Sequence, residues 1–262
     1  MTDLLAGKRG LVFGVANDKS IAWGIANVLH RHGAEMAFTY LGEAFEKRVR
    51  PLAESTGSTI IMDTDVQKPE TLDALFDRIA EEWGRLDFVV HAIAYADKDD
   101  LSGRFMKTSR DGFMKALDVS CYSLVDIARR AHPLMSGGGS IITLSFLGSQ
   151  RVTPNYNVMG VAKAALEASV RYLANDLGPD GIRVNAISPG PMRTLAGAAI
   201  GGARKVYRAT EANSPMRANA DLDHVGGAAL YLVSDYGAST TGECLFVDGG
   251  YHAIGMFQPE NL

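Results

Sequence analysis

Tyr156 and Lys163 are the two residues whose types and spacing best suit chemistry. They lie seven positions apart in the stretch LSFLGSQRVTPNYNVMGVAK, residues 144–163. Seven residues are almost two turns of an α-helix, so both side chains would project on one side, about 20° apart. An ammonium near a phenol favours the phenolate and lowers the pKa of the tyrosine. Such a phenol can stabilise charge on a substrate oxygen, although a helix-surface pair with no role has the same spacing.

Seven short apolar runs are the candidate strands that would position this pair. They cover residues 9–15, 35–40, 58–63, 86–93, 139–145, 182–188 and 243–248. Most are continuously hydrophobic, which is typical of strands covered on both faces. Longer amphipathic stretches between them predict helices near 21–32, 43–55, 69–84, 109–134, 156–178 and 222–234.

The alternation of strands and helices predicts an α/β fold. We expect a Rossmann-type, doubly wound parallel sheet of about seven strands with helices on both faces. A chain of 262 residues can form this as one domain over residues 1–262. Residues 189–220, rich in Gly, Pro and Ala, predict a mobile loop or short helices over a site.

The predicted helix that carries the pair has one apolar face. Its apolar residues recur at steps of three or four: Ala162, Leu166, Val170, Leu173 and Leu177. This spacing indicates that the face is buried. The helix directly follows the fifth predicted strand, and ligands bind at the carboxyl ends of the strands in such sheets. Its position therefore favours a catalytic role for Tyr156 and Lys163.

The junction between the first predicted strand and helix suits a nucleotide. It reads GVANDKSIAWGIA, residues 14–26, with Gly14, Ser20 and Gly24 where the strand passes to the helix. Glycine permits close approach of the backbone to phosphate, and a helix N-terminus offers free N–H groups to an anion. The strict G-x-G-x-x-G spacing is absent, so the signal depends on its place after the first strand.

The end of the second predicted strand favours NADH over NADPH. It reads TYLGEAFEKR, in which Leu41 and Gly42 offer no cation for a 2′-phosphate. Lys47 and Arg48 lie further along the next helix, where a solvated face explains them. Asp65 follows the third strand and could bond the adenine amino group, but a turn aspartate is an equally good reading.

Composition disfavours several other classes of protein. The net charge of −4 and pI of about 5.9 give no support for a nucleic-acid-binding face. We expect no membrane span and no signal peptide, and cytoplasm is the default location. Cys121 and Cys244 form no metal-like spacing, and the six histidines form no H-E-x-x-H motif, so we expect no metal site.

Four segments together resemble a known family. They are GVANDKSIAWGIA, VVHAIAYAD, PNYNVMGVAKAALEASVRYLA and GIRVNAISPGPMRTLA. They are similar to the bacterial enoyl-acyl-carrier-protein reductases, a divergent branch of the short-chain dehydrogenase/reductase superfamily. The resemblance covers essentially the whole chain. The T-G-x-x-x-G-I-G and N-N-A-G motifs of common ketoreductases are absent.

The resemblance implies a reaction and a set of contacts. Hydride would pass from NADH to Cβ of a trans-2-enoyl thioester in fatty-acid elongation, with Tyr156 stabilising the enolate and Lys163 binding the nicotinamide ribose. Cofactor contacts are implied at Gly14, Ser20, Ile21, Leu41, Asp65, Val66, Ile93, Lys163, Met192 and Thr194. Substrate contacts are implied at Ala96, Phe146 and Tyr156. The resemblance also implies a homotetramer, a substrate lid near 195–212 and a carrier-protein-bound substrate.

Phe146 is a departure from that family, in which many members carry a second tyrosine at this position. A phenyl ring cannot donate a hydrogen bond, so we expect Phe146 to pack against substrate or cofactor, or simply in the core. Two other functions stay open: a carbonyl or hydroxyl oxidoreductase assisted by Thr143 or Ser145, and a nucleotide-binding scaffold without turnover. The small basic cluster Arg204, Lys205 and Arg208, in an otherwise acidic protein, suits an acidic carrier protein or a solvated helix face.

Overall fold

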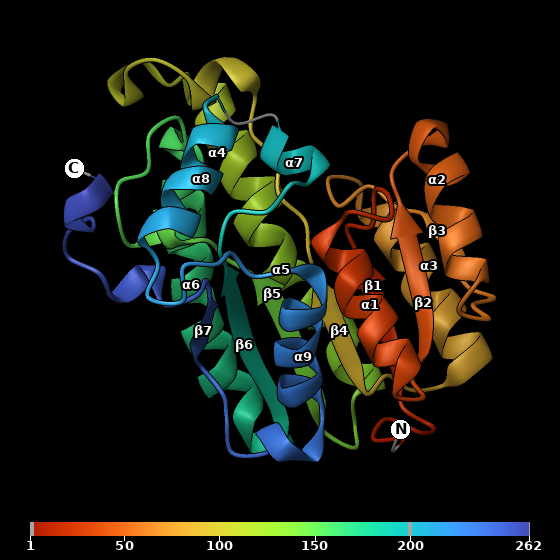
Figure 1. The fold of residues 1–262 in the computed structure, drawn as a ribbon. Coiled ribbons are helices and arrows are strands. Elements are labelled where there is room, and N and C mark those ends of the chain that lie inside the picture. The colour runs from red at the N-terminus through yellow and green to blue at the C-terminus, as the bar shows by residue number, and fades with distance from the viewer. Residues whose placement is uncertain (1–2, 199–200, 262) are drawn as a thin grey trace.

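Seven parallel strands form one sheet in a computed structural model that describes residues 3–198 and 201–261 (Figure 1). The strand order is β3-β2-β1-β4-β5-β6-β7. The strands are β1 (Arg9–Phe13), β2 (Glu35–Tyr40), β3 (Ile61–Asp63), β4 (Phe88–His91), β5 (Gly139–Leu144), β6 (Ile182–Pro189) and β7 (Cys244–Val247). All seven predicted strands are confirmed, most of them shorter at one or both ends than the apolar runs.

Helices cover both faces of the sheet, as predicted (Figure 1). Helices α1 (Ile21–Arg31), α2 (Glu43–Glu54) and α9 (Leu222–Val233) pack into one core, with Ile25, Val49 and Val225 fully buried. Helices α3 (Pro69–Trp83), α5 (Ser123–Ala131) and α6 (Asn157–Leu177) pack into the other, with Leu75, Ile127 and Leu166 fully buried. Because both faces are covered, the central strands consist mainly of hydrophobic residues, and polar strand residues such as His91, Ser140 and Asn185 are themselves buried.

The chain reverses direction across the sheet between β1 and β4. From β1 it winds outward to β2 and β3, then returns to β4 on the other side of β1 and continues to β7. Such a switch point leaves a crevice outside the carboxyl ends of the two strands. The fold therefore places a ligand-binding crevice beside the ends of β1 and β4.

The predicted helix 109–134 is interrupted. It consists of α4 (Arg110–Leu117), a π-helical turn at Asp118–Tyr122, and α5, followed by a 3₁₀ turn at His132–Leu134. The hydroxyl of Ser123 donates to the carbonyl of Val119 at 2.7 Å. This hydrogen bond gives a partner to a carbonyl group of the irregular turn. Apolar periodicity cannot detect such an irregularity, because the buried face continues through it. π-Helical turns are frequent at functional sites.

The irregular region after β6 contains two short helices, α7 (Leu195–Ala198) and α8 (Ala203–Asn213). They occupy most of the segment that was expected to cover the site, near 195–212. Residues 199–200 of that segment lie outside the described residues.

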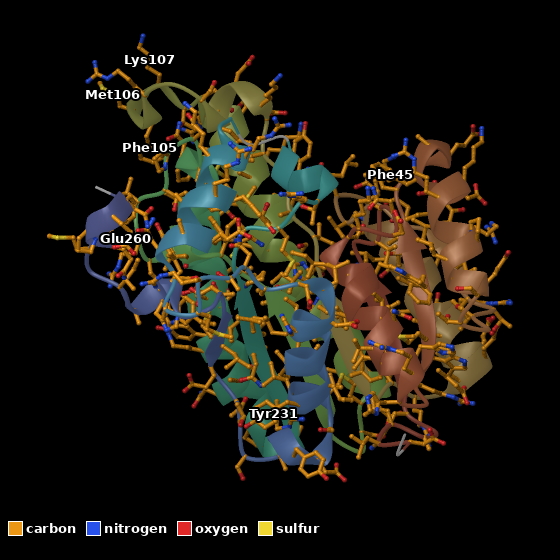
Figure 2. All side chains as sticks on the ribbon, in the orientation of Figure 1. Phe45, Phe105, Met106, Lys107, Tyr231 and Glu260 are labelled. Carbon is orange, nitrogen blue, oxygen red and sulfur yellow. The ribbon has the colours of Figure 1, made fainter. Side chains whose placement is uncertain are left out.

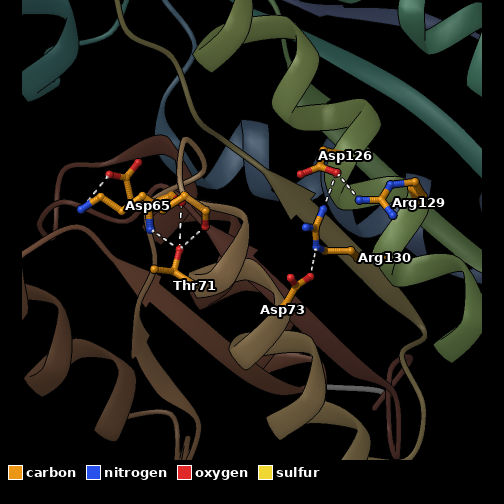
Figure 3. Close-up of polar contacts among 7 residues, drawn as sticks. Asp65, Thr71, Asp73, Asp126, Arg129 and Arg130 are labelled. Atoms are coloured by element: carbon orange, nitrogen blue, oxygen red, sulfur yellow. Dashed lines mark hydrogen bonds and ion pairs between the residues drawn. The ribbon is translucent and has the colours of Figure 1, made fainter.

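An arginine-centred network joins α3 to α5 (Figure 3). Arg130 Nε donates to Asp73 of α3 at 2.8 Å, and Arg130 also pairs with Asp126 of its own helix. Arg129 pairs with the same aspartate at 2.7 Å. Arg130 and Asp126 are both 9% exposed, so their ion pair is screened less than a surface pair. The pair of Arg130 with Asp73, which is 62% exposed, joins α3 to α5.

Candidate active site

The predicted site residues gather at one edge of the sheet. Each follows the carboxyl end of a strand or begins the next helix: Gly14, Ser20 and Ile21 after β1, Leu41 after β2, Asp65 and Val66 after β3, Ile93 and Ala96 after β4, Phe146, Tyr156 and Lys163 after β5, and Met192 and Thr194 after β6. Because the strands are parallel, their carboxyl ends meet at the same edge. The structure thus brings the predicted residues to one edge, while their contacts with ligands stay predictions.

The turn after β1 forms a cradle that requires glycine. Gly14 has φ +91°, and a Cβ there would lie 2.1 Å from the carbonyl oxygen of Ala92. The Ser20 hydroxyl accepts hydrogen bonds from the backbone N–H groups of Ala16 and Asn17, both at 2.9 Å. Helix α1 then begins at Ile21 with no acidic residue in its first turn. Its first N–H groups lack intrahelical partners, so the cradle fits a pyrophosphate.

The end of β2 carries a feature that the sequence did not reveal. Leu41 is 55% exposed, and the N–H of Gly42 donates to the Asp63 carboxylate at 2.8 Å. The sequence separates Asp63 from this turn by twenty-one positions, but the pairing of β2 with β3 brings them together. A carboxylate beside this turn would repel a 2′-phosphate. This contact favours the unphosphorylated ribose of NADH.

Asp65 makes the contacts of a turn residue (Figure 3). Its carboxylate accepts from the N–H of Gln67 at 3.0 Å and pairs with Lys68 at 3.7 Å. Its backbone N–H bonds the hydroxyl of Thr71 at 3.0 Å. The turn interpretation therefore has direct support, and the contact with adenine stays a prediction.

Tyr156 lies in a small apolar cluster beside the end of β5. It is the N-cap residue of α6, which begins one position later than expected, and it is 7% exposed. The tyrosine cluster consists of Leu101, Tyr156, Met159 and Ala162, with Ala96, Leu117 and Phe146 partly buried against it. The ring of Phe146 meets the tyrosine edge-on, with centroids 5.0 Å apart and planes at 63°. Phe146 and Ala96 therefore lie beside Tyr156, where a substrate contact was expected.

The segment between β4 and α4 forms one wall of this cluster. Leu101 points inward and is 8% exposed, while Met106 is 74% exposed. Phe105, Met106 and Lys107 project outward from the same segment (Figure 2). Opposite, Phe146 also lines a cavity of about 420 Å³, together with Pro191, Val206 and Ala209. Phe146 therefore contacts both the tyrosine and a mostly apolar cavity next to α8, which Arg151, Lys205 and Asp248 also line.

Lys163 is buried and directed at the backbone. It is 5% exposed, and its Nζ donates to the carbonyl oxygen of Leu144 at 2.6 Å. Burial lowers the pKa of its ammonium to about 8, while Cys121 and Glu167 act in the opposite direction. The lysine is therefore anchored at the end of β5, next to the crevice.

The predicted effect of the lysine on the tyrosine is wrong in this structure. Burial raises the pKa of Tyr156, and the negative charge of Glu167 raises it further. Desolvation of the phenolate is the larger of these two causes. The structure therefore keeps Tyr156 protonated, as a hydrogen-bond donor.

His91, at the end of β4, is a buried residue that the sequence did not single out. Its Nδ1 contacts the Thr143 hydroxyl and its Nε2 the Ser123 hydroxyl, both at 2.8 Å. Both hydroxyls also contact backbone carbonyls, Ser123 that of Val119 and Thr143 that of His91 itself. Burial, followed by the charge of Lys163, lowers the pKa of His91 to about 3. The imidazole is thus neutral, and its two contacts link Thr143 of β5 to Ser123, the residue that follows the π-helical turn.

A glycine-lined cradle after β1 and a Tyr–Lys pair after β5, on one doubly wound sheet, are the features of a dinucleotide-dependent oxidoreductase. The model of the family described as enoyl-(acyl carrier protein) reductase matches residues 14–252, and this chain belongs to that family.

Relatives and solved structures agree with the family. A curated enoyl-[acyl-carrier-protein] reductase [NADH] of Rhizobium meliloti is 53% identical, over 97% of this chain and 93% of the relative. The structure of the Anaplasma phagocytophilum reductase with NAD matches with a TM-score of 0.95 and 55% identity, covering 98% of each chain. The Bacillus cereus reductase with NADP⁺ and an inhibitor also matches at 0.95, with 50% identity over 98% of this chain and all of that one. Both cofactor forms therefore occur in structures of this fold.

Proposed function

We propose that this chain is an NADH-dependent enoyl-acyl-carrier-protein reductase that saturates trans-2-enoyl thioesters in fatty-acid elongation. The observation that carries the proposal is the buried Tyr156, held protonated beside Phe146 and Lys163 at the carboxyl edge of the sheet. The test is NADH oxidation with a crotonyl or dodecenoyl thioester beside an acetoacetyl thioester. Turnover of the enoyl substrate alone is expected. Turnover of the keto substrate instead would contradict the proposal.

The tyrosine would do the electrostatic part of the reaction. Bound NADH supplies the hydride that goes to Cβ of the substrate. Negative charge then gathers on the thioester oxygen, where the Tyr156 hydroxyl donates a hydrogen bond to the enolate. The raised pKa keeps the proton on the phenol for this role. Protonation of Cα completes the saturated thioester.

Because residue 146 is a phenylalanine and not a second tyrosine, Tyr156 supplies the single tyrosyl hydroxyl of the proposed site. The ring of Phe146 cannot donate a hydrogen bond, but it packs edge-on against Tyr156 and limits the orientations of the tyrosine ring. The mostly apolar cavity beside Phe146 suits carbons of the acyl chain further along than Cα and Cβ, which must lie at Tyr156. We propose that Ala96, Phe146 and Tyr156 contact the substrate and that residues 195–212 cover it.

The cofactor would lie along the carboxyl ends of β1 to β6. Its pyrophosphate fits the cradle of Gly14, Ser20 and Ile21, and Lys163 would hold ribose hydroxyls. Asp63, beside the Leu41 turn, supports NADH over NADPH. The remaining proposed contacts are Leu41, Asp65, Val66, Ile93, Met192 and Thr194.

In the alternative of a ketone reductase, Thr143 or Ser145 would assist Tyr156, but both hydroxyls already have partners within the protein. The Thr143 hydroxyl is in contact with His91, and the Ser145 hydroxyl donates to Glu167. Both side chains are buried, at 0% and 4% exposure. Neither group is directed at the crevice as an assisting donor. A scaffold that only binds the nucleotide would use Lys163 in the same way, so turnover of the enoyl thioester is what distinguishes the enzyme from the scaffold.

The basic cluster Arg204, Lys205 and Arg208 is exposed along α8, next to the cavity. We propose that it receives an acidic carrier protein. Reversing all three charges should raise KM for the carrier-bound enoyl substrate roughly tenfold and leave KM for a coenzyme A thioester unchanged. Charge reversal of Lys47 and Arg48, equally exposed on α2, is the control. Equal effects on both substrates would contradict docking at α8.

We also propose that residues 1–262 form one domain, that the protein is a homotetramer and that it is cytoplasmic. Tyr172 on α6 is 80% exposed in the single chain, which suits a helix that contacts a partner copy. Sedimentation equilibrium should give four chain masses, and a monomer mass would contradict the tetramer.

Across residues 3–198 and 201–261, every helix is too short or too polar to span a bilayer.

A further inference from the structure

Glu167 is a buried carboxylate one helical turn beyond Lys163 on α6. Its side chain lies in the interior, and the residue is 6% exposed. Four side chains donate to its two oxygens: Ser145, Ser149, Gln150 and Cys244. The two serine hydroxyls lie 2.5 Å from Oε1, and the Gln150 amide lies 3.0 Å from Oε2. The carboxylate is therefore partnered on both oxygens.

Three of these donors belong to the segment that carries Phe146. Ser145 precedes the phenylalanine, and Ser149 and Gln150 follow it within one turn. Lys163 holds the same segment at the carbonyl of Leu144. Two side chains of α6, four residues apart, thus fix segment 144–150 at both ends. Phe146 lies between these anchors.

The same segment touches the catalytic ring. A Cβ on Gly148 would lie 2.4 Å from Cδ1 of Tyr156, so the backbone of the segment lies directly against the phenol. Phe146 packs on the same tyrosine edge-on. A shift of segment 145–150 would therefore move the surroundings of the reacting hydroxyl.

Stability alone does not explain a buried carboxylate here. Removing a carboxylate from water costs several kcal/mol, and even well-paired buried charges are often no better for stability than apolar residues. A group of this kind is better understood as fixing one arrangement of its donors. The donors of Glu167 are the residues around Phe146.

We propose that Glu167 is a positioning residue for the reaction: it holds segment 145–150 so that Phe146 keeps its edge contact with Tyr156. This role rests on the proposed function. A single-hydroxyl site depends on this arrangement, because one hydroxyl must be aimed at the substrate oxygen without help from a second. Misplacement of a catalytic group by about 1 Å can cost about 100-fold in rate.

Glu167 also acts electrostatically on both site residues. Its charge adds to burial in raising the pKa of Tyr156, and it opposes the effect of burial on the pKa of Lys163. The other titratable or charged groups around this region are Cys121 from the π-helical turn, His91 from β4, Cys244 and Glu243 at β7, and Arg171 on α6. Burial first, and then Glu167, raises the pKa of Cys244 to about 12, so that thiol stays a donor.

Three variants test the proposal. Glu167→Gln removes the charge and keeps the shape, Glu167→Asp keeps the charge and shortens the reach, and Glu81→Gln removes an exposed glutamate of α3 as the control. For each we would measure the melting temperature, kcat with crotonyl thioester, and NADH affinity by fluorescence across pH 6–10.

Glu167→Gln should lower kcat roughly tenfold to 100-fold. Its loss of NADH affinity at basic pH should begin at a lower pH than in the wild type, because the Lys163 ammonium loses a neighbouring negative charge. Glu167→Asp should keep the wild-type pH midpoint with an intermediate kcat. Glu81→Gln should behave as the wild type.

A purely structural role predicts another pattern. If Glu167→Gln lowers the melting temperature but keeps the wild-type kcat and pH midpoint, the positioning role is wrong. If Glu167→Gln fails to fold, Glu167→Asp decides: wild-type kcat with that shorter side chain would also overturn the proposal. NADH binding separates this test from the function itself, since a wild type that binds NADH but reduces no enoyl thioester refutes the function alone.

Discussion

Replacing Tyr156 by Phe should lower kcat for a trans-2-enoyl thioester about 100- to 1000-fold. The substitution removes one oxygen atom, the donor that would stabilise the enolate. The phenyl ring that remains still packs against Phe146 and the apolar residues of the tyrosine cluster. Stability and NADH affinity should therefore change little. Steady-state kinetics and NADH fluorescence measure the two effects separately.

Tyr172→Phe is the matched control for this experiment. Tyr172 lies on the same helix, away from the tyrosine cluster, and Phe keeps its ring for a contact with a partner copy, so loss of its hydroxyl should leave kcat unchanged. A Tyr156→Phe variant with more than a third of the wild-type kcat would show that the phenol does not stabilise the enolate. A comparable loss in both variants would point to the helix rather than to the hydroxyl.

Replacing Lys163 by Met should weaken NADH binding about 10- to 100-fold, the range expected for a lost charge-assisted hydrogen bond. The lysine is buried and anchored on Leu144, so its ammonium is fixed beside the crevice in advance. Methionine fills nearly the same volume without the charge. Lys8→Met, at the opposite end of the sheet, is the control and should bind NADH as the wild type does.

The same lysine should give NADH binding a pH dependence. Burial lowers the pKa of Lys163 to about 8 in the cofactor-free protein. The ammonium is therefore present below pH 8 and lost above it, so wild-type affinity should fall as pH rises through 8. The Lys163→Met variant should lack this fall. An unchanged pH profile in the variant would show that the ammonium does not bind the cofactor.

The fold was predictable because its signals are local and repeated. Each central strand is buried on both faces, so its hydrophobic run is continuous in the sequence, and each helix shows one apolar face. The place of Tyr156 and Lys163 followed from the strand that precedes them. Helix α6 begins one residue later than predicted, because Tyr156 acts as the N-cap residue rather than as part of the helix.

The interior of the site was not predictable, because its contacts join distant parts of the chain. Glu167 receives donors from residues 17 to 22 positions earlier and from Cys244, 77 positions later. His91 is joined to residues 32 and 52 positions away. Polar residues of this kind look like surface residues in a sequence pattern. The error over the pKa of Tyr156 has the same origin, since burial is not visible in the spacing of two residues.

The most direct test of the account is to follow the hydride. Crotonyl thioester would be reduced with NADH carrying deuterium at the transferable position of the nicotinamide, and the product examined by NMR and mass spectrometry. We predict one deuterium at Cβ of a saturated thioester whose carbonyl group is intact. Crotonyl thioester recovered without deuterium, together with deuterium on the carbinol carbon of the hydroxybutyryl thioester formed from acetoacetyl thioester, would contradict the account and identify a carbonyl reductase.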